Sequence, residues 1–209
     1  MARLAVFDLD GTLVDSLDDL HASVNHALAA VGLAPRTRGE VHGFVGEGAR
    51  VLLARAVAPH GELLEPALAA WRPHYEAHCL DRTRAYPGIE ALLAGARRVL
   101  AVHTNKPGVM ARKIVAGLGL LPRFAAVVGG DEAPRKPDPT GLLEIMARMG
   151  APPEETVFIG DSRHDVETAH AAGVEMVAVA WGFSTRDELV RAGAMVLVES
   201  AAELARWVE

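Results

Sequence analysis

The sequence has a single cysteine, few aromatic residues and no excess of basic charge, and each of these absences narrows the possible functions. Cys79 cannot form an internal disulfide, which fits a reducing compartment. Lys and Arg total 21 against 27 Asp and Glu, and the formal net charge is −6. Because there is also no basic stripe with interleaved aromatics, we expect no nucleic-acid partner.

Long hydrophobic runs are also missing. The first apolar run, Leu4–Phe7, is broken by Asp8 and is too short for the core of a signal peptide, and no later run reaches membrane-spanning length. We therefore expect a cytoplasmic protein with no membrane partner, present as a monomer or small homo-oligomer. A chain of 209 residues, half of them hydrophobic, is long enough for one domain with a proper core and a small insertion.

What the sequence does contain is a regular alternation of short apolar runs with segments of helical period. Several of the helical segments end at a glycine, as expected just past a helix C-terminus. This alternation predicts an α/β fold with a doubly wound, mostly parallel, Rossmann-like sheet. The predicted strands are Leu4–Phe7, Val99–His103, Ala125–Val128, Thr156–Ile159, Met176–Val179 and Met195–Val198, and the helical segments are Pro107–Leu118, Asp138–Met149, His164–Ala172 and Thr185–Ala192, with Gly150, Gly173 and Gly193 as terminal glycines.

The rhythm is broken between about Leu17 and Arg84, where Ala- and Leu-rich helical segments occur without a convincing strand. We interpret residues 17–84 as an inserted α-helical cap domain, and residues 1–16 and 85–209 as the α/β core. A cap inserted there would lie over the strand ends, where it could exclude water and select the substrate. The alternative is a set of ordinary helices packed on one face of the sheet.

Two carboxylates, Asp8 and Asp10, stand where the first strand meets the turn at Gly11. The turn allows both side chains to converge on one point, and acidic groups at the carboxyl end of a strand suit Mg²⁺. Taken alone, the motif could equally be an Asp-Gly turn between two elements.

Two further motifs follow later strands. Thr104 and Asn105 offer a hydroxyl and free backbone N–H groups at a helix start, which can hold a phosphoryl group, although simple N-capping is the alternative. Lys136 lies between prolines that fix its backbone, and a rigid ammonium there could neutralise carboxylates and a transferring phosphoryl group. A solvated loop lysine is the alternative.

Asp161 and Asp165 follow the fourth strand and are spaced to share one face of a helix turn. Helix capping would explain both residues without a metal. However, all the acidic groups that follow strands of one parallel sheet meet at one edge, and such a cluster would repel itself without a cation. We therefore predict a Mg²⁺ site from Asp8, Asp10, Asp161 and Asp165.

These motifs together resemble the haloacid-dehalogenase superfamily of aspartyl phosphotransferases, and within it the phosphoglycolate phosphatases. The resemblance covers nearly the whole chain. His103 departs from it, because an apolar residue usually stands before the motif threonine. The matching superfamily motifs are Asp8-Leu9-Asp10-Gly11-Thr12, Thr104-Asn105, Lys136-Pro137 and Gly160-Asp161-Ser162 with Asp165, and the subfamily features include Val45-Gly46-Glu47-Gly48, Tyr86-Pro87-Gly88 and Thr104-Asn105-Lys106-Pro107.

The resemblance implies a Mg²⁺-dependent phosphatase that forms an aspartyl-phosphate on Asp8, with Asp10 as general acid and base. The acid at Asp10 argues against dehalogenation, because the dehalogenases of the superfamily lack it. The remaining implied roles are metal binding by Asp8, the Asp10 carbonyl, Asp161 and Asp165, phosphoryl binding by Thr104 and the Asn105 backbone, and charge compensation by Lys136.

The expected partner is a small phosphomonoester, with 2-phosphoglycolate first and a sugar phosphate, a phosphomutase reaction or a non-catalytic phosphometabolite-binding module as alternatives. Arg50 is our candidate for recognition of the substrate from the cap, since arginine suits carboxylates; a surface arginine is the alternative. His74 and His78 have a spacing that could bind zinc, but no complete ligand set is evident.

Overall fold

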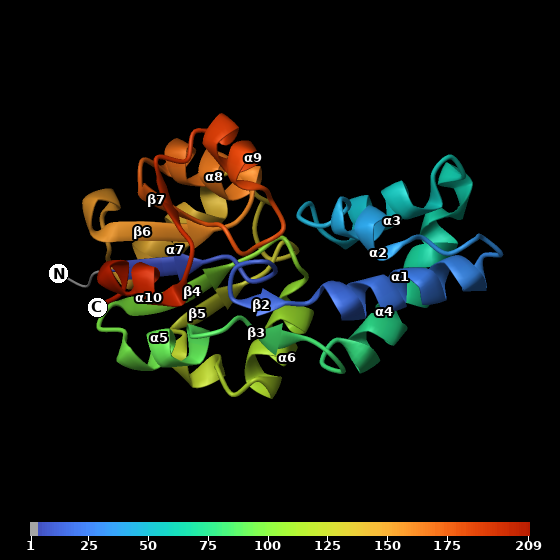
Figure 1. The fold of residues 1–209 in the computed structure, drawn as a ribbon, viewed down its shortest axis with the longest axis horizontal. Helices are drawn as coiled ribbons and strands as arrows, with labels where there is room; N and C mark the ends of the chain where they lie inside the picture. The colour runs from blue at the N-terminus through green and yellow to red at the C-terminus, as the bar shows by residue number, and fades with distance from the viewer. Residues whose placement is uncertain (1–3) are drawn as a thin grey trace.

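The computed structural model describes residues 4–209, and at its centre is a six-stranded sheet in which all neighbouring strands are parallel (Figure 1). The strand order is β5-β4-β1-β6-β7-β8, so the chain winds outward from β1 in one direction and then returns to continue in the other. Ligands of such sheets bind at the carboxyl ends of the strands beside this reversal, here between β1 and β6. The strands are β1 (Leu4–Phe7), β4 (Val99–His103), β5 (Ala126–Val128), β6 (Thr156–Gly160), β7 (Glu175–Val179) and β8 (Val196–Val198).

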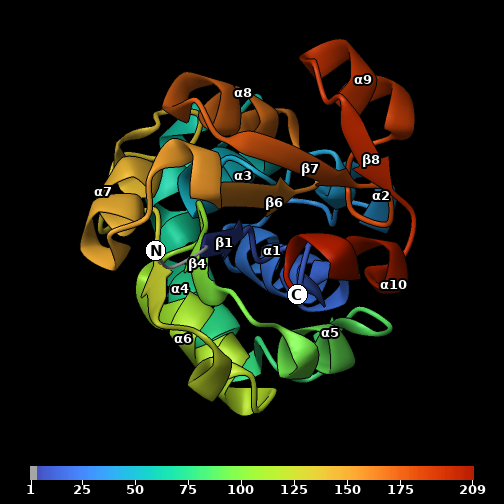
Figure 2. The same ribbon diagram turned by 90° about the vertical axis from the view of Figure 1, so that its left-hand side faces the viewer.

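Helices cover both faces of the sheet (Figure 2). Alternation along β1 sends Ala5 and Phe7 into one hydrophobic core and Leu4 and Val6 into the other. Both faces are thus buried, which confirms the predicted doubly wound parallel sheet. The first core includes α5 (Ile89–Gly95), α6 (Gly108–Gly117) and α10 (Ala201–Leu204), and the second α7 (Thr140–Met149), α8 (Arg163–Ala172) and α9 (Arg186–Ala192).

The helix ends follow the local sequence. Gly150, Gly173 and Gly193 each adopt the left-handed conformation at the C-cap of α7, α8 and α9, as the terminal glycines predict. At the other end of α8, Ser162 and Asp165 form a reciprocal capping box, which fixes the first turn of the helix. This box matters for the site, because Asp165 is also one of the predicted acidic residues.

A separate group of helices lies beyond the carboxyl ends of the strands (Figure 1). It is joined to the sheet through an antiparallel ribbon, β2 (Val14–Asp15) with β3 (Arg84–Ala85), which the sequence did not predict. The group comprises α1 (Leu17–Ala30), α2 (Arg38–His42), α3 (Ala49–Val57) and α4 (Leu64–His78), and short 3₁₀ turns occupy Gly61–Leu63, Leu121–Arg123, Pro153–Glu155 and Ala205–Trp207.

The two chain segments that connect this group to the core are fastened together by Asp19. Its buried carboxylate accepts hydrogen bonds from the backbone N–H groups of Arg82 and Thr83 and from the Thr83 hydroxyl, at 2.7–3.1 Å. An ionised acceptor shared by several donors is stronger than a neutral one. Asp19 therefore ties the start of α1 to the segment that leads into β3, and it fixes the geometry of the two segments that connect the helical group to the core.

No helix in the part of the chain that the structure describes is both long and apolar enough to cross a membrane.

The histidines of α4 have a structural role as stacked rings. The rings of His74 and His26 stack with centroids 4.0 Å apart, and His78 lies 4.4 Å from His74 on the other side. Across residues 4–209 the only group of acidic, histidine or cysteine side chains close enough to share a metal lies elsewhere, so the structure gives no support to a zinc site here.

Candidate active site

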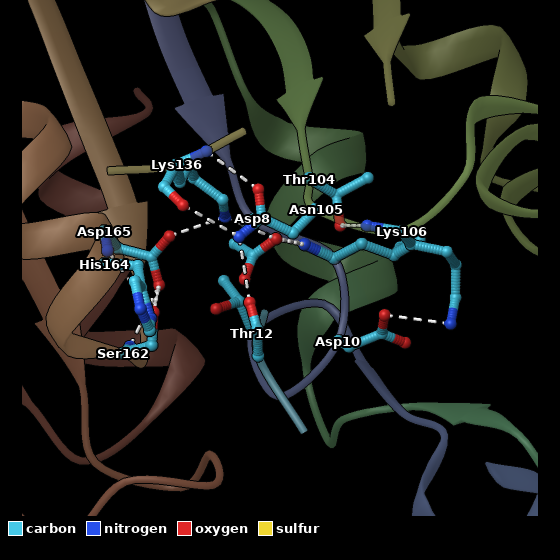
Figure 3. A network of polar contacts seen from close by, with 12 residues as sticks. Asp8, Asp10, Thr12, Thr104, Asn105, Lys106, Lys136, Ser162, His164 and Asp165 are labelled. Carbon is cyan, nitrogen blue, oxygen red and sulfur yellow. Dashed lines mark hydrogen bonds and ion pairs between the residues drawn. The ribbon is translucent and has the colours of Figure 1, made fainter. Parts of the chain in front are cut away.

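The predicted motif residues that follow β1, β4, β5 and β6 converge at one edge of the sheet (Figure 3). This convergence follows from the topology, because parallel strands all deliver their carboxyl ends to the same edge. Nearly all of these side chains are buried. The residues brought together are Asp8, Asp10, Thr104, Asn105, Lys136, Asp161 and Asp165.

Asp8 lies at the centre of the cluster. Its Oδ1 accepts a hydrogen bond of 2.7 Å from the Leu9 N–H and forms an ion pair of 2.8 Å with Lys136 Nζ. Burial raises the pKa of Asp8 to about 7 against the opposing effect of Lys136, and the nearby carboxylate of Asp165 adds to the rise. Both contacts fall on Oδ1, so within the described chain Oδ2 is left without a hydrogen-bond donor and can act as a nucleophile or metal ligand.

Lys136 bridges two carboxylates. Its Nζ lies 2.8 Å from Asp8 Oδ1 and 2.6 Å from Asp165 Oδ1. Burial disfavours the ammonium, but the two carboxylates outweigh burial and raise the pKa of Lys136, so it stays charged. The side chain of Asn105 clamps the lysine backbone, accepting from its N–H at 2.8 Å and donating to its carbonyl at 3.1 Å. The sequence did not predict this clamping role for Asn105.

Each oxygen of the Asp161 carboxylate accepts one hydrogen bond. Its Oδ1 accepts from the Thr12 hydroxyl at 2.7 Å, and its Oδ2 accepts from the Phe183 N–H at 2.8 Å. Burial raises its pKa well above the usual value, and the charges of Asp165 and Asp8 raise it further. The turn at Gly11 permits this packing: a Cβ there would lie 2.2 Å from Asp161 Oδ2, and the residue has φ of +84°. The contribution of Phe183 was not predicted, since a backbone donor carries no sequence signal.

A divalent cation fits this arrangement. Asp8, Asp161 and Asp165 each offer a carboxylate oxygen within 4.8 Å of the others, and Mg²⁺ prefers oxygen ligands. Both oxygens of Asp165 already have partners, since Oδ1 pairs with Lys136 and Oδ2 accepts from Ser162. Asp165 would therefore act mainly by adding negative charge beside the cation. The carboxylates outnumber the two ammonium groups paired with them, so a bound cation would offset the repulsion among the acidic groups that helps to raise the pKa of Asp8 and Asp161.

The carboxylate of Asp10 faces a different set of partners. Its Oδ1 accepts from the Ser16 hydroxyl at 2.5 Å, and its Oδ2 lies 2.9 Å from Nζ of Lys106. Figure 3 shows the pairing of Asp10 with Lys106. Lys106 is buried and also donates to the Tyr75 hydroxyl of α4 at 2.8 Å. The motif containing Lys106 was recognised in the sequence, but no function was assigned to the lysine itself.

A pocket separates the sheet edge from the helical group. Its floor is acidic and polar, and its roof is largely apolar. A second pocket opens on the other side of Asp8 and Asp10, towards Asp161, Ser162 and His42. The first pocket is lined by Asp8, Asp10, Thr104, Asn105, Lys106 and Pro107 from the core and by Leu20, Val45, Gly46, Gly48, Ala49, Leu52 and Trp71 from the helical group.

The structure does not bring Arg50 into the site. Its guanidinium forms an ion pair of 2.5 Å with Glu65, its side chain is 56% exposed, and it lines neither pocket beside Asp8. The reason is the orientation of α3, whose buried face carries Leu52, Leu53, Ala56 and Val57. Arg50 lies outside that face, so the role that its position near the Gly46–Gly48 loop predicts is not supported.

Comparison with known proteins places the fold and the motifs in context. Residues 5–179 match the haloacid dehalogenase-like hydrolase family. The chain is 40% identical over 221 residues to a phosphoglycolate phosphatase of Rhodospirillum rubrum, covering 100% of this chain and 91% of that protein. It is 38% identical over 216 residues to phosphoglycolate phosphatase 1 of Pseudomonas aeruginosa, covering 98% and 79%. A crystal structure from Haemophilus somnus, described as a predicted phosphoglycolate phosphatase, superposes with a TM-score of 0.93 at 29% identity, covering 98% of this chain and 97% of that one.

Proposed function

Because the chain belongs to the haloacid dehalogenase-like hydrolases, we propose that it is a Mg²⁺-dependent phosphatase that converts 2-phosphoglycolate to glycolate and phosphate. The observation that carries the proposal is the pairing of a free Asp8 Oδ2 with a second carboxylate, Asp10, in the same pocket. One acid can then act as nucleophile while the other handles protons. The names of the relatives from Rhodospirillum rubrum and Pseudomonas aeruginosa support the choice of substrate.

In the first step Asp8 Oδ2 attacks phosphorus. The ester P–O bond breaks, its electron pair goes to the leaving glycolate oxygen, and Asp10 donates the proton that this oxygen takes up. The result is an aspartyl-phosphate on Asp8. Lys136 keeps Oδ1 engaged during the attack, so the carboxylate presents its other oxygen to the substrate.

In the second step Asp10 removes a proton from water as the water attacks the aspartyl-phosphate. The bond between phosphorus and Asp8 breaks, which restores the carboxylate and releases phosphate. Thr104 and the backbone N–H of Asn105 bind phosphoryl oxygens, and the ammonium of Lys136 offsets their charge. These groups line or border one pocket, which supports their joint action.

Mg²⁺ would be held by a carboxylate oxygen of Asp8 and by Asp161, with Asp165 supporting the site. The main-chain carbonyl of Asp10 would be a further ligand, as the family resemblance implies. When bound, Mg²⁺ supplies positive charge next to the phosphoryl oxygens. Residues 17–84 act as the cap that covers the pocket and excludes water.

Phosphate release from chelator-treated protein tests the proposal. The protein is assayed with 2-phosphoglycolate, glucose 6-phosphate and p-nitrophenyl phosphate, with and without added Mg²⁺. Mg²⁺-dependent turnover that favours 2-phosphoglycolate is the expected result. Preference for the sugar phosphate would keep the chemistry and replace the substrate, transfer of phosphate to sugar rather than water would indicate a mutase, and no turnover would indicate a binding module.

A further inference from the structure

Lys106 has an environment that the proposed hydrolytic steps do not use. Its side chain is only 4% exposed, yet the residue lines the pocket beside Asp8 and Asp10. Among the described residues that line this pocket it is the one cationic side chain, because Lys136 lies behind Asp8 and Arg50 points to Glu65. Burying a cation is costly unless it is paired, so the partners that Lys106 already has decide how much capacity it keeps for a ligand.

The partners of Lys106 leave part of its binding capacity free. An ammonium has three N–H donors, and the structure gives Nζ two acceptors, Asp10 Oδ2 at 2.9 Å and the Tyr75 hydroxyl at 2.8 Å. Both acceptors are polar oxygens, and the carboxylate of Asp10 pairs with the charge of the ammonium. The third N–H has no acceptor among the described residues, so it could donate to a ligand in the pocket.

A second donor without a partner stands in the same pocket wall. Trp71 lines the pocket and is 2% exposed, and its indole Nε1 is buried with no hydrogen-bond acceptor. The Trp71 ring stacks on Tyr75 with centroids 4.8 Å apart and planes 15° from parallel. Tyr75 does not itself line the pocket, but its hydroxyl accepts from Lys106 Nζ at 2.8 Å, so it connects the lysine to the pocket-lining Trp71. Buried donors normally find acceptors, so an unpaired donor on a pocket-lining residue is a candidate contact for an anionic ligand.

We propose that Lys106, held by the hydroxyl of Tyr75 beside the pocket-lining Trp71, binds the carboxylate of the substrate and selects phosphomonoesters that carry an acid group two bonds from the ester oxygen. This inference rests on the proposed phosphatase function and adds the specificity residue that it lacks. The size of 2-phosphoglycolate suits the placement, since Asp8, where phosphorus is attacked, and Lys106 border the same pocket. A compact ammonium also suits a single small carboxylate.

The position of Lys106 links recognition to the chemistry. The same ammonium contacts Asp10, the proposed general acid, and Tyr75 of α4. A substrate carboxylate on Lys106 would therefore place the ester oxygen near Asp10, and it would do so only when α4 is docked against the core. Lys106 was missed in the sequence because the partner that positions it, Tyr75, is 31 residues away.

The test compares two esters that differ only in the acid group, 2-phosphoglycolate and ethyl phosphate, in wild-type protein and in Lys106→Met. We expect wild-type protein to prefer 2-phosphoglycolate and the variant to lose about 10- to 100-fold of that preference, mainly through KM, as expected for the loss of one charge-assisted hydrogen bond. Lys106→Arg should restore part of it. Equal losses on both esters would show that Lys106 only supports Asp10 and would overturn the inference.

Lys113→Met is the matched control. Lys113 also reaches from the core to α4, where it donates to the Glu76 carbonyl, but it does not line the pocket. This variant should keep the wild-type preference, and a similar loss in it would assign the effect to docking of α4 and overturn the inference. Circular dichroism and thermal unfolding of each variant establish that it is folded.

The failure of the function and the failure of the inference give different results. If wild-type protein hydrolyses both esters equally well, the phosphatase stands and carboxylate recognition fails. If it hydrolyses neither, the phosphatase fails, and calorimetric titration with 2-phosphoglycolate still tests the subsite. In that case weaker binding to Lys106→Met supports the inference, and unchanged binding overturns it.

Discussion

Replacement of His103 by leucine should reduce the sensitivity of the fold to acid. His103 ends β4 directly before Thr104, is 1% exposed, and has a buried Nδ1 without a hydrogen-bond partner. The centroid of its ring lies 6.1 Å from that of Phe158. Burial, reinforced by the charge of Lys136, lowers the pKa of His103 from 6.5 to about 3.

The sign of the effect follows from the direction of this shift. Because the folded-state pKa lies below the unfolded value, the unfolded chain binds a proton first as the pH falls. The contribution of His103 to stability is therefore fully present above pH 6.5 and is lost as the pH falls towards 3. With about 1.4 kcal/mol per pKa unit, acidification to about pH 5 costs about 2 kcal/mol at this residue alone.

Urea unfolding of metal-free protein at about pH 7.5 and about pH 5 measures this difference, with the midpoint and slope determined for both proteins. The wild-type protein should lose about 2 kcal/mol more than His103→Leu between the two conditions. The comparison cancels the carboxylates, which titrate in both proteins, and any packing change that is independent of pH. Equal losses in the two proteins would mean that His103 is not held neutral by the fold and would refute the reasoning.

Three further predictions concern the site and the connection to α1. Asp8→Asn should abolish phosphate release yet keep or raise the unfolding temperature above pH 7, because burial raises the pKa of Asp8 to about 7 and makes its ionised form costly; turnover near the wild-type rate would remove Asp8 as the nucleophile. Mg²⁺ at about 100 times its dissociation constant should stabilise wild-type protein by about 2.7 kcal/mol in calorimetry, and an undiminished shift in Asp161→Asn would argue against that ligand. Asp19→Asn should cost about 2 kcal/mol in urea unfolding, since it weakens the bonds to Arg82 and Thr83; an unchanged midpoint would show that the connection does not depend on this carboxylate.

The sheet could be predicted from the sequence because its strands are buried on both faces. Such strands leave uninterrupted apolar runs, and the predicted runs match β1 and β4 at both ends and the other four strands to within one residue. The ribbon of β2 and β3 could not be found in this way. It pairs only Val14 with Ala85 and Asp15 with Arg84, and two residues are too few to show a period.

The acidic cluster was predictable for a related reason, and the cap residues were not. Asp8, Asp10, Asp161 and Asp165 all follow strands of one parallel sheet, so topology alone gathers them. Which cap side chain enters the pocket depends instead on the rotation of each helix and on how the helices dock. Arg50 carried the chemistry expected for substrate recognition but lies on the exposed side of α3.

The two buried lysines of the site differ in where their partners come from. Lys136 takes its partners from the core: Asp8, Asp165 and, through its backbone, Asn105. Asp165 is itself fixed by the capping box of α8, so the ammonium beside Asp8 does not depend on the position of helices α1–α4. Lys106 instead shares its ammonium between Asp10 and a hydroxyl carried by α4. If the proposed function holds, chemistry common to many phosphomonoesters can reside in the core, whereas discrimination among them would depend on the contact between Lys106 and α4. Substitutions that change substrate preference should then act at Lys106 and Tyr75 rather than at Lys136.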